Sequence, residues 1–127
     1  MFAPTHANNF HNNATPPDNY INLQLIKAAD SVNKIGHNYD DSMTEFISAH
    51  SLPNKIFQYN YVLKIDTNKY DIRKLKEIDE KQIFDSVIMT AAFKEIRDYN
   101  VTIIYNFIDM NQNPLYKLVF TPDTYKK

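Results

Sequence analysis

The segment from residue 56 to residue 65 alternates between two kinds of side chain with unusual regularity. Large apolar or aromatic residues occupy every second position, and these are Phe57, Tyr59, Tyr61, Leu63 and Ile65. Alternation with a period of two is typical of a strand that has one face in a core. We therefore expect Tyr59 and Tyr61 to face the rest of the fold, and Gln58 and Asn60 to face away.

The size and composition of the chain favour one soluble folded domain. With 127 residues and 43% hydrophobic residues, the chain can bury a core without disulfides or metals. The 14 basic and 15 acidic residues nearly balance, so charge indicates neither a nucleic acid nor an anionic membrane as partner. No apolar run approaches the length of about 18 residues that a membrane span needs. The absence of cysteine excludes thiol chemistry and disulfides, and it fits any redox compartment.

The first 17 residues differ from the rest because they are rich in Asn and Pro and have no periodic pattern. We predict that residues 1–17 form a flexible leader and residues 18–127 a single domain. Thr5 and Ala7 have the spacing of small residues at the end of a secretory signal, although the basic and long apolar regions are missing. The leader is thus either the remnant of a signal peptide or an ordinary irregular N-terminus.

The next part of the chain predicts a helix followed by a hairpin. A helix should start near Asp18 and end at Gly36, the one glycine, which we expect to adopt the left-handed conformation. Its buried side would carry Ile21, Leu25, Ala28, Val32 and Ile35. Strands at 43–49 and 56–65, joined by a turn at Pro53-Asn54, should then pair as an antiparallel hairpin.

The second half repeats this order. A helix is predicted from residue 71 through residue 88, with a break near Thr90, a further helix at 91–98 and a helix end at Asn100. Strands at 101–108 and 115–121 follow, separated by a turn at 111–114. The predicted fold is α+β with the order α-β-β-α-β-β. It consists of a four-stranded antiparallel sheet with two helices packed on one face.

Three segments resemble a pattern found in small, uncharacterised bacterial α+β proteins that are made as exported precursors. These segments are 40–44, 52–63 and 99–105, and the similarity spans roughly residues 20–125. Members often carry cysteines near the positions of Met89 and Tyr125 and glycine at the position of Asn100, so this chain lacks any such disulfide. The resemblance implies a periplasmic or extracellular location and supplies no catalytic residues.

Residues with catalytic or metal-binding chemistry are scattered. His6, His11, His37 and His50 form no i, i+4 pair, which predicts no metal site. Glu45 and His50 would lie on opposite faces of a regular strand, so they should not form an acid–base pair. A nucleophile elbow and a phosphate loop both need glycines that this chain lacks. We therefore expect no catalytic residue and no cofactor.

Surplus apolar surface is the one sign of a binding site. Residues 101–108 are apolar on both faces, which a sheet covered on one side does not require. The predicted binding residues on the sheet face are Ile104, Ile108, Tyr116 and Phe120.

These observations predict a non-enzymatic, exported accessory module that binds another protein through an open sheet face or an edge strand. The partner could also be a second copy of the chain, giving a homodimer. The alternative is a carrier of a small apolar ligand held between helices and sheet, lined by Phe84, Ile88, Tyr61 and Phe107.

Overall fold

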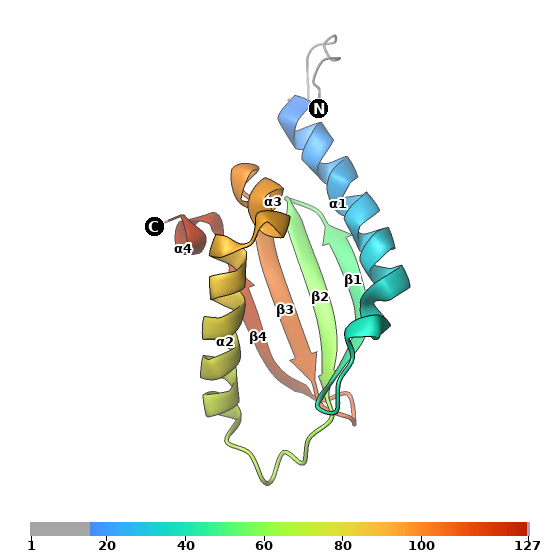
Figure 1. Ribbon diagram of the computed structural model, residues 1–127, viewed down its shortest axis with the longest axis vertical. Helices are drawn as coiled ribbons and strands as arrows, with labels where there is room; N and C mark the ends of the chain where they lie inside the picture. The colour runs from blue at the N-terminus through green and yellow to red at the C-terminus, as the bar shows by residue number, and fades with distance from the viewer. Residues whose placement is uncertain (1–15, 127) are drawn as a thin grey trace.

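The computed structural model describes the backbone of residues 16–126 and the side chains of residues 19–126 (Figure 1). The helices of the described residues are α1 (Pro16–Ile35), α2 (Ile72–Met89), α3 (Lys94–Asp98) and α4 (Pro122–Tyr125), with short 3-10 helices η2 (Gly36–Tyr39) and η3 (Ala91–Phe93). The strands are β1 (Thr44–Leu52), β2 (Ile56–Leu63), β3 (Thr102–Ile108) and β4 (Pro114–Phe120). The predicted α+β class and the α-β-β-α-β-β order are confirmed, with the short α4 added at the end.

The strands form one mixed sheet in the order β1-β2-β3-β4. Both hairpins, β1 with β2 and β3 with β4, are antiparallel as predicted. The central strands β2 and β3 are parallel, so the prediction of a wholly antiparallel sheet is wrong at this pair. The reason lies in residues 64–101, because a long connection that contains a helix crosses over the sheet and returns the chain in the same direction.

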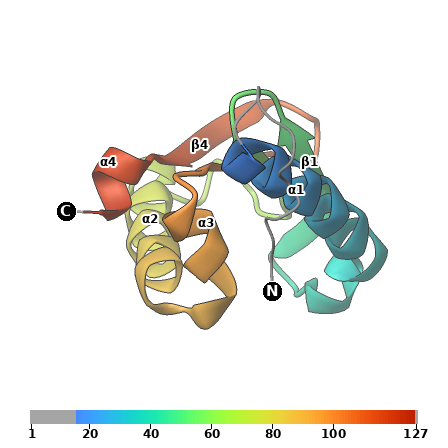
Figure 2. The same ribbon diagram turned by 90° about the horizontal axis from the view of Figure 1, so that it is seen from above.

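The helices lie on one face of the sheet, as predicted, and leave the other face open (Figure 2). Helix α1 packs against β1, whereas α2 packs against β4. The buried residues accordingly form two clusters. The cluster under α1 comprises Ile21, Leu25, Ala29, Phe46, Ala49, Phe57 and Val101. The cluster under α2 comprises Leu63, Ile65, Val87, Ile103, Tyr105, Phe107, Tyr116, Leu118, Phe120 and Tyr125.

The ends of the helices have clear local causes. Asp71 caps α2 by accepting hydrogen bonds from the backbone N–H groups of Arg73 and Lys74. Asn100 has a φ of 61°, which confirms that the chain reverses there through a left-handed residue. Helix α1 begins at Pro16, two residues before the predicted start, because proline is well tolerated in a first helical turn.

The backbone conformation of Gly36 differs from the predicted one. Its φ is not positive, so the left-handed conformation is absent there. A Cβ atom on this buried glycine would lie 2.3 Å from Cδ2 of Phe46. The position thus needs glycine for close packing of the end of α1 against β1 rather than for its backbone angles.

Strand β1 contains a bulge between Phe46 and Ser48. Phe46 and Ala49 are three residues apart, yet both are buried on the helix side because the bulge inserts an extra residue. Ile47, at the bulge, is 44% exposed. The predicted turn at Pro53-Asn54 is confirmed, and Asn54 and Lys55 both have a positive φ.

The predicted flexible leader lies almost entirely outside the described residues. Within those residues, no helix combines the length and the apolar character that crossing a membrane requires.

Candidate functional site

Four aromatic rings form a continuous stack across the two central strands on the helix side of the sheet. We call Tyr59, Tyr61, Tyr105 and Phe107 the tyrosine strip. The ring centroids of Tyr59 and Tyr105 are 4.7 Å apart, and those of Tyr61 and Phe107 are 5.5 Å apart. The ring planes of each pair are nearly parallel, with interplanar angles of 15° and 19°. Such offset stacking stabilises large rings beyond the area that they bury.

The parallel register of β2 and β3 creates this stack. Tyr59 lies directly opposite Tyr105, and Tyr61 lies directly opposite Phe107. All four residues point to the helix side, as the alternation along β2 predicts for Tyr59 and Tyr61. That prediction is confirmed, because both tyrosines pack against the two buried clusters, whereas Gln58 and Asn60 lie on the other face.

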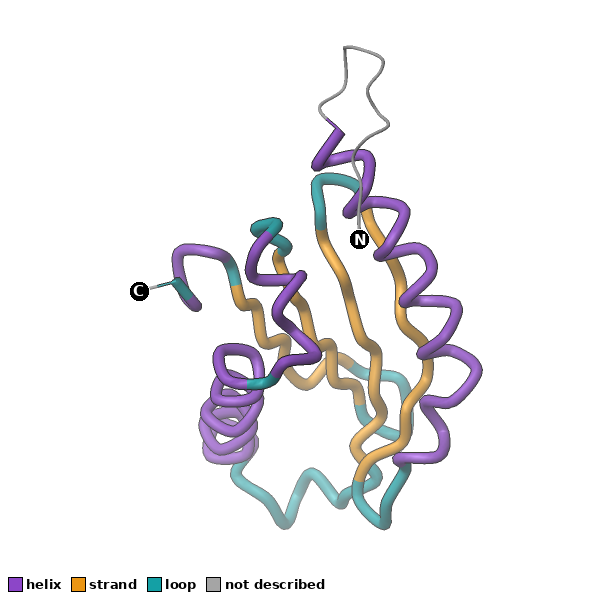
Figure 3. The backbone as a smooth tube through the Cα atoms, turned by 45° about the horizontal axis from the view of Figure 1, so that its top comes forward, coloured by secondary structure: helices purple, strands orange, loops and turns teal. Residues whose placement is uncertain are grey.

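The strip lies between the two long helices. Helix α1 covers β1 and α2 covers β4, so the strip occupies the strands between them (Figures 1 and 3). Tyr105 is buried, with 8% of its surface exposed, while Tyr59 and Tyr61 remain partly exposed. The strip is therefore an apolar floor that is only partly covered by the helices.

The three tyrosine hydroxyls of the strip have no hydrogen-bond partner among the residues that the structure describes. This holds for Tyr59, Tyr61 and Tyr105, and it includes the buried Tyr105. Burial raises the pKa of Tyr59 to about 12, and it also raises the pKa of Tyr61 and of Tyr105. A buried hydroxyl without a partner costs free energy, of the order of 1–3 kcal/mol. Tyr105 carries this cost, whereas the partly exposed hydroxyls of Tyr59 and Tyr61 can bond to water or to a bound group.

Other buried tyrosines of this chain are satisfied. The Tyr125 hydroxyl donates to the backbone oxygen of Val101 at 2.7 Å, and the Tyr116 hydroxyl donates to a carboxylate oxygen of Asp79. Among the buried tyrosines of the described residues, Tyr105 in the strip therefore differs from Tyr116 and Tyr125.

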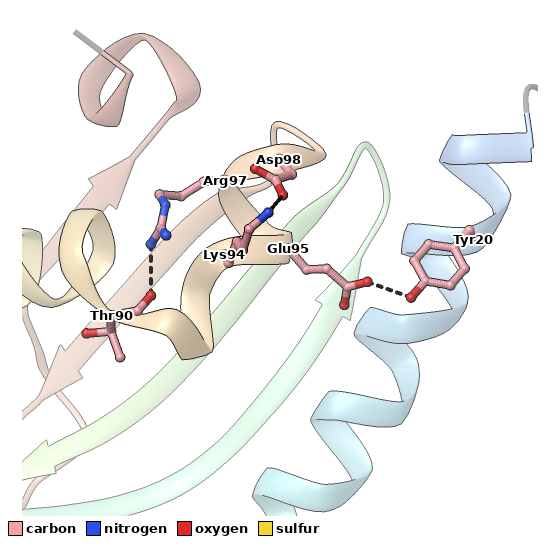
Figure 4. Close-up of polar contacts among 6 residues, drawn as sticks. All are labelled: Tyr20, Thr90, Lys94, Glu95, Arg97 and Asp98. Atoms are coloured by element: carbon pink, nitrogen blue, oxygen red, sulfur yellow. Dashed lines mark hydrogen bonds and ion pairs between the residues drawn. The ribbon is translucent and has the colours of Figure 1, made fainter. Parts of the chain in front are cut away.

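A polar contact joins α1 to α3 (Figure 4). The Tyr20 hydroxyl on α1 donates to Oε2 of Glu95 on α3 at 2.5 Å. This hydrogen bond raises the pKa of Tyr20 to about 12. Arg97 connects α3 to the end of α2, because its Nη1 donates to the backbone oxygens of Val87 and Thr90. The α3 segment thus bridges α1 and α2.

The predicted binding residues divide between the two faces of the sheet. Ile104 and Ile108 lie on the open face and are half-buried. Tyr116 and Phe120 instead lie on the helix side, where they are 9% and 1% exposed. Their placement on the open face is wrong because β4 directs Tyr116, Leu118 and Phe120 toward α2 and leaves Lys117 and Val119 outward.

The open face carries a line of polar side chains between its apolar residues. Asn60 is at its centre, because it accepts from Gln58 and from Asn106 and donates to Ser48. Together with the Ser48 hydroxyl, these amides form hydrogen bonds across three strands. Their polar groups are therefore largely satisfied without a ligand.

The bulge in β1 changes one expectation about acid–base chemistry. Glu45 lies opposite Val62 and His50 lies opposite Gln58, and both of these partners face outward. Glu45 and His50 therefore share a face, contrary to the prediction. His50 bonds to Ser48 through Nε2, at 3.0 Å.

The residues predicted to line a ligand cavity lie in two places. Phe84 and Ile88 on α2 pack against the cluster that α2 covers, whereas Tyr61 and Phe107 belong to the strip. Sequence analysis identified Tyr61 and Phe107 as candidates but missed the strip as a unit, since ring stacking across β2 and β3 depends on their register.

Comparison with solved structures reveals the same fold in other bacterial proteins. A candidate secreted protein from Pseudomonas aeruginosa matches with a TM-score of 0.72 and 12% identity, covering 89% of this chain and 99% of its own. The type II secretion system pilotin AspS from Vibrio cholerae matches with a TM-score of 0.65 and 8% identity, covering 85% and 94% of the two chains. The pilotin EpsS of the Vibrio vulnificus type II secretion system matches with a TM-score of 0.69 and 10% identity. The match covers 87% of this chain and 96% of the EpsS chain.

No protein-family model matches the sequence, and no curated protein matches it either. At these identities the likeness is one of fold. It agrees with the resemblance to small exported bacterial α+β proteins that the sequence indicates.

Proposed function

We propose that this chain is an exported, non-enzymatic accessory protein that binds a segment of a partner protein at the tyrosine strip. The observation that carries the proposal is the set of three stacked tyrosines whose hydroxyls have no hydrogen-bond partner in the described part of the chain. An apolar floor with unpaired polar groups at its surface suits a peptide segment, which offers both apolar side chains and backbone hydrogen-bonding groups.

The fold supports the accessory role. Two of the matching structures are pilotins of type II secretion systems, and a third match is a candidate secreted protein. We infer an accessory task in protein export of the same general kind, carried out outside the cytoplasm in the periplasm or the extracellular space.

The strip is a better binding surface than the open face of the sheet or its β1 edge. On the open face, the amides of Gln58, Asn60 and Asn106 already bond within the sheet. The β1 edge is covered, because Asn33 bonds to the backbone of Ala49 and Asp40 accepts from the backbone N–H of Phe46. Side chains placed in this way oppose the addition of another strand.

Site-specific photo-crosslinking in the native host tests the proposal. A photoreactive phenylalanine analogue at position 59 samples the strip, and the same residue at position 104 samples the open face. We expect one protein adduct from position 59 and none from position 104. Adducts from position 104 alone would move the site to the open face and overturn the assignment to the strip.

A second measurement tests whether the tyrosine hydroxyls contribute to binding of the captured partner. The captured partner, once purified, should bind the Tyr59→Phe/Tyr61→Phe variant more weakly than the parent chain by about 10-fold to 30-fold, since two hydrogen bonds are lost while both rings remain. Equal affinities would contradict the proposal. An adduct between two copies of this chain would support a homodimer instead, and recovery of a small apolar molecule without an adduct would favour the ligand carrier.

A further inference from the structure

Three potential metal ligands meet where the chain passes from the end of α1 into β1. His37 belongs to η2, Asp40 follows η2 directly, and Glu45 belongs to β1. One possible ligand atom of each lies within 4.8 Å of those of the other two. The sequence predicts no metal site here, because the three residues match no spacing motif and only the fold brings Glu45 to the others.

The distances within this cluster suit a small divalent cation. Nδ1 of His37 and Oδ2 of Asp40 are 3.2 Å apart. Two ligand atoms on a tetrahedral zinc ion, with bonds of about 2.0–2.2 Å, lie about 3.3–3.6 Å apart. The first two atoms already have nearly this separation. A carboxylate oxygen of Glu45 has to move by about 1.5 Å at most, which rotation of its flexible side chain allows.

Hydrogen bonds to the backbone hold the loop that carries these residues. The Phe46 N–H donates to Oδ1 of Asp40 at 2.7 Å, which orients this carboxylate and leaves Oδ2 toward His37. Asp41 accepts from the N–H groups of Met43 and Thr44 at 2.8 and 2.7 Å, which fixes the turn before Glu45. Such outer contacts orient metal ligands and strengthen binding.

The charges also favour a cation. Asp40 supplies one carboxylate to the cluster. Glu45 supplies a second carboxylate, and the His37 side chain is 58% exposed, which leaves room for water ligands. Lys64 acts on Asp40 only weakly. One imidazole with two carboxylates is a ligand set that zinc and similar first-row ions accept.

We propose that His37, Asp40 and Glu45 bind a divalent cation of the zinc class, with water completing its coordination. The bound ion would connect the end of α1 to β1, so its binding energy would stabilise the folded chain. This inference does not depend on the function proposed for the tyrosine strip.

Zinc titration of the full chain tests the site. His6, His11 and His50 can also take up zinc, so all variants carry alanine at these three positions. We expect the background protein to bind one zinc ion by calorimetry. His37→Ala and Glu45→Gln should each weaken binding by about 10-fold or more, whereas Glu77→Gln, which removes a charge from the exposed side of α2, should not change it.

Melting temperature provides an independent readout. Zinc should raise it for the background protein and leave it unchanged for the His37→Ala variant. His37 also contacts Asp40 and the Phe46 ring, so the rise with zinc is measured relative to the zinc-free melting temperature of the same variant. Failure to bind zinc at about 1 mM, or equal binding before and after the His37 substitution, would overturn the proposal.

Discussion

The side chain of Asn33 in α1 bonds both backbone polar groups of Ala49 in β1. Its Nδ2 donates to the Ala49 oxygen at 3.0 Å, and the Ala49 N–H donates to its Oδ1 at 2.7 Å. The amide thus imitates a neighbouring strand at an edge of the sheet. It satisfies backbone groups that a sheet edge otherwise leaves to water or to another chain.

Replacing Asn33 with alanine should reduce the free energy of unfolding by about 1–3 kcal/mol, because two hydrogen bonds are lost and partly buried backbone groups lose their partner. Urea unfolding measures this change. Asn38→Ala, at an exposed position of η2, is the matched control and should stay within about 0.5 kcal/mol of the parent. Equal effects of the two substitutions would show that the Asn33 contact contributes nothing.

Removal of the hydroxyl should change the stability of the chain differently at two buried tyrosines. Tyr125→Phe should destabilise the chain by about 1–2 kcal/mol, since its hydroxyl bonds to the Val101 oxygen. Tyr105→Phe should leave stability unchanged or raise it, because its hydroxyl has no partner among the described residues. Chemical unfolding of both variants distinguishes these outcomes. A large loss from Tyr105→Phe would mean that this hydroxyl is already satisfied, and the argument for the strip would fail.

Gly36→Ala should destabilise the chain by about 1–3 kcal/mol, since the new Cβ would lie 2.3 Å from the buried Phe46 ring. In a Phe46→Ala background the ring is absent, so the same substitution at Gly36 should cost much less there. A double-mutant cycle measured by urea unfolding gives this coupling. Additive effects would indicate that steric contact with Phe46 is not the reason for glycine.

Stability should fall at high pH. Burial raises the pKa of Tyr59 to about 12, compared with about 10 for a tyrosine in an unfolded chain. Between these values the folded state holds more protons than the unfolded state, so the free energy of unfolding decreases as pH rises. The contribution is fully present below about pH 10 and is lost as pH passes about 12.

Unfolding curves taken at several pH values across this window measure the effect. The Tyr59→Phe variant keeps the ring but has no titrating group at this position, so its stability should decline less steeply than that of the parent. Parallel declines would show that Tyr59 does not cause the loss.

Local patterns in the sequence predicted the elements well. The two-residue alternation of β2 fixed the direction of Tyr59 and Tyr61, and Asp71 and Asn100 marked the start of α2 and the end of α3. These features depend on residues that are close in sequence. The small α+β fold was also within reach, because the resemblance covered most of the chain.

Features that depend on long-range arrangement were not predictable in this way. The bulge at Ile47 placed Glu45 and His50 on one face, although a regular strand separates them. The parallel pairing of β2 with β3 determines which rings stack. Tyr116 and Phe120 are buried because α2 packs over β4. For the same reason, the sequence did not bring Glu45 to His37.

The parallel contact between β2 and β3 has a consequence for how the chain can be divided. Residues 16–65 hold α1 with the first hairpin, and residues 72–126 hold α2 with the second. The loop at 66–71 is the covalent connection between these two halves (Figure 3). The strip is built from both halves, two rings from each. Two fragments separated at this loop would each keep a helix and a hairpin and would expose complementary strand edges. Their reassembly would form the strip anew, which makes this fold a natural candidate for a split reporter.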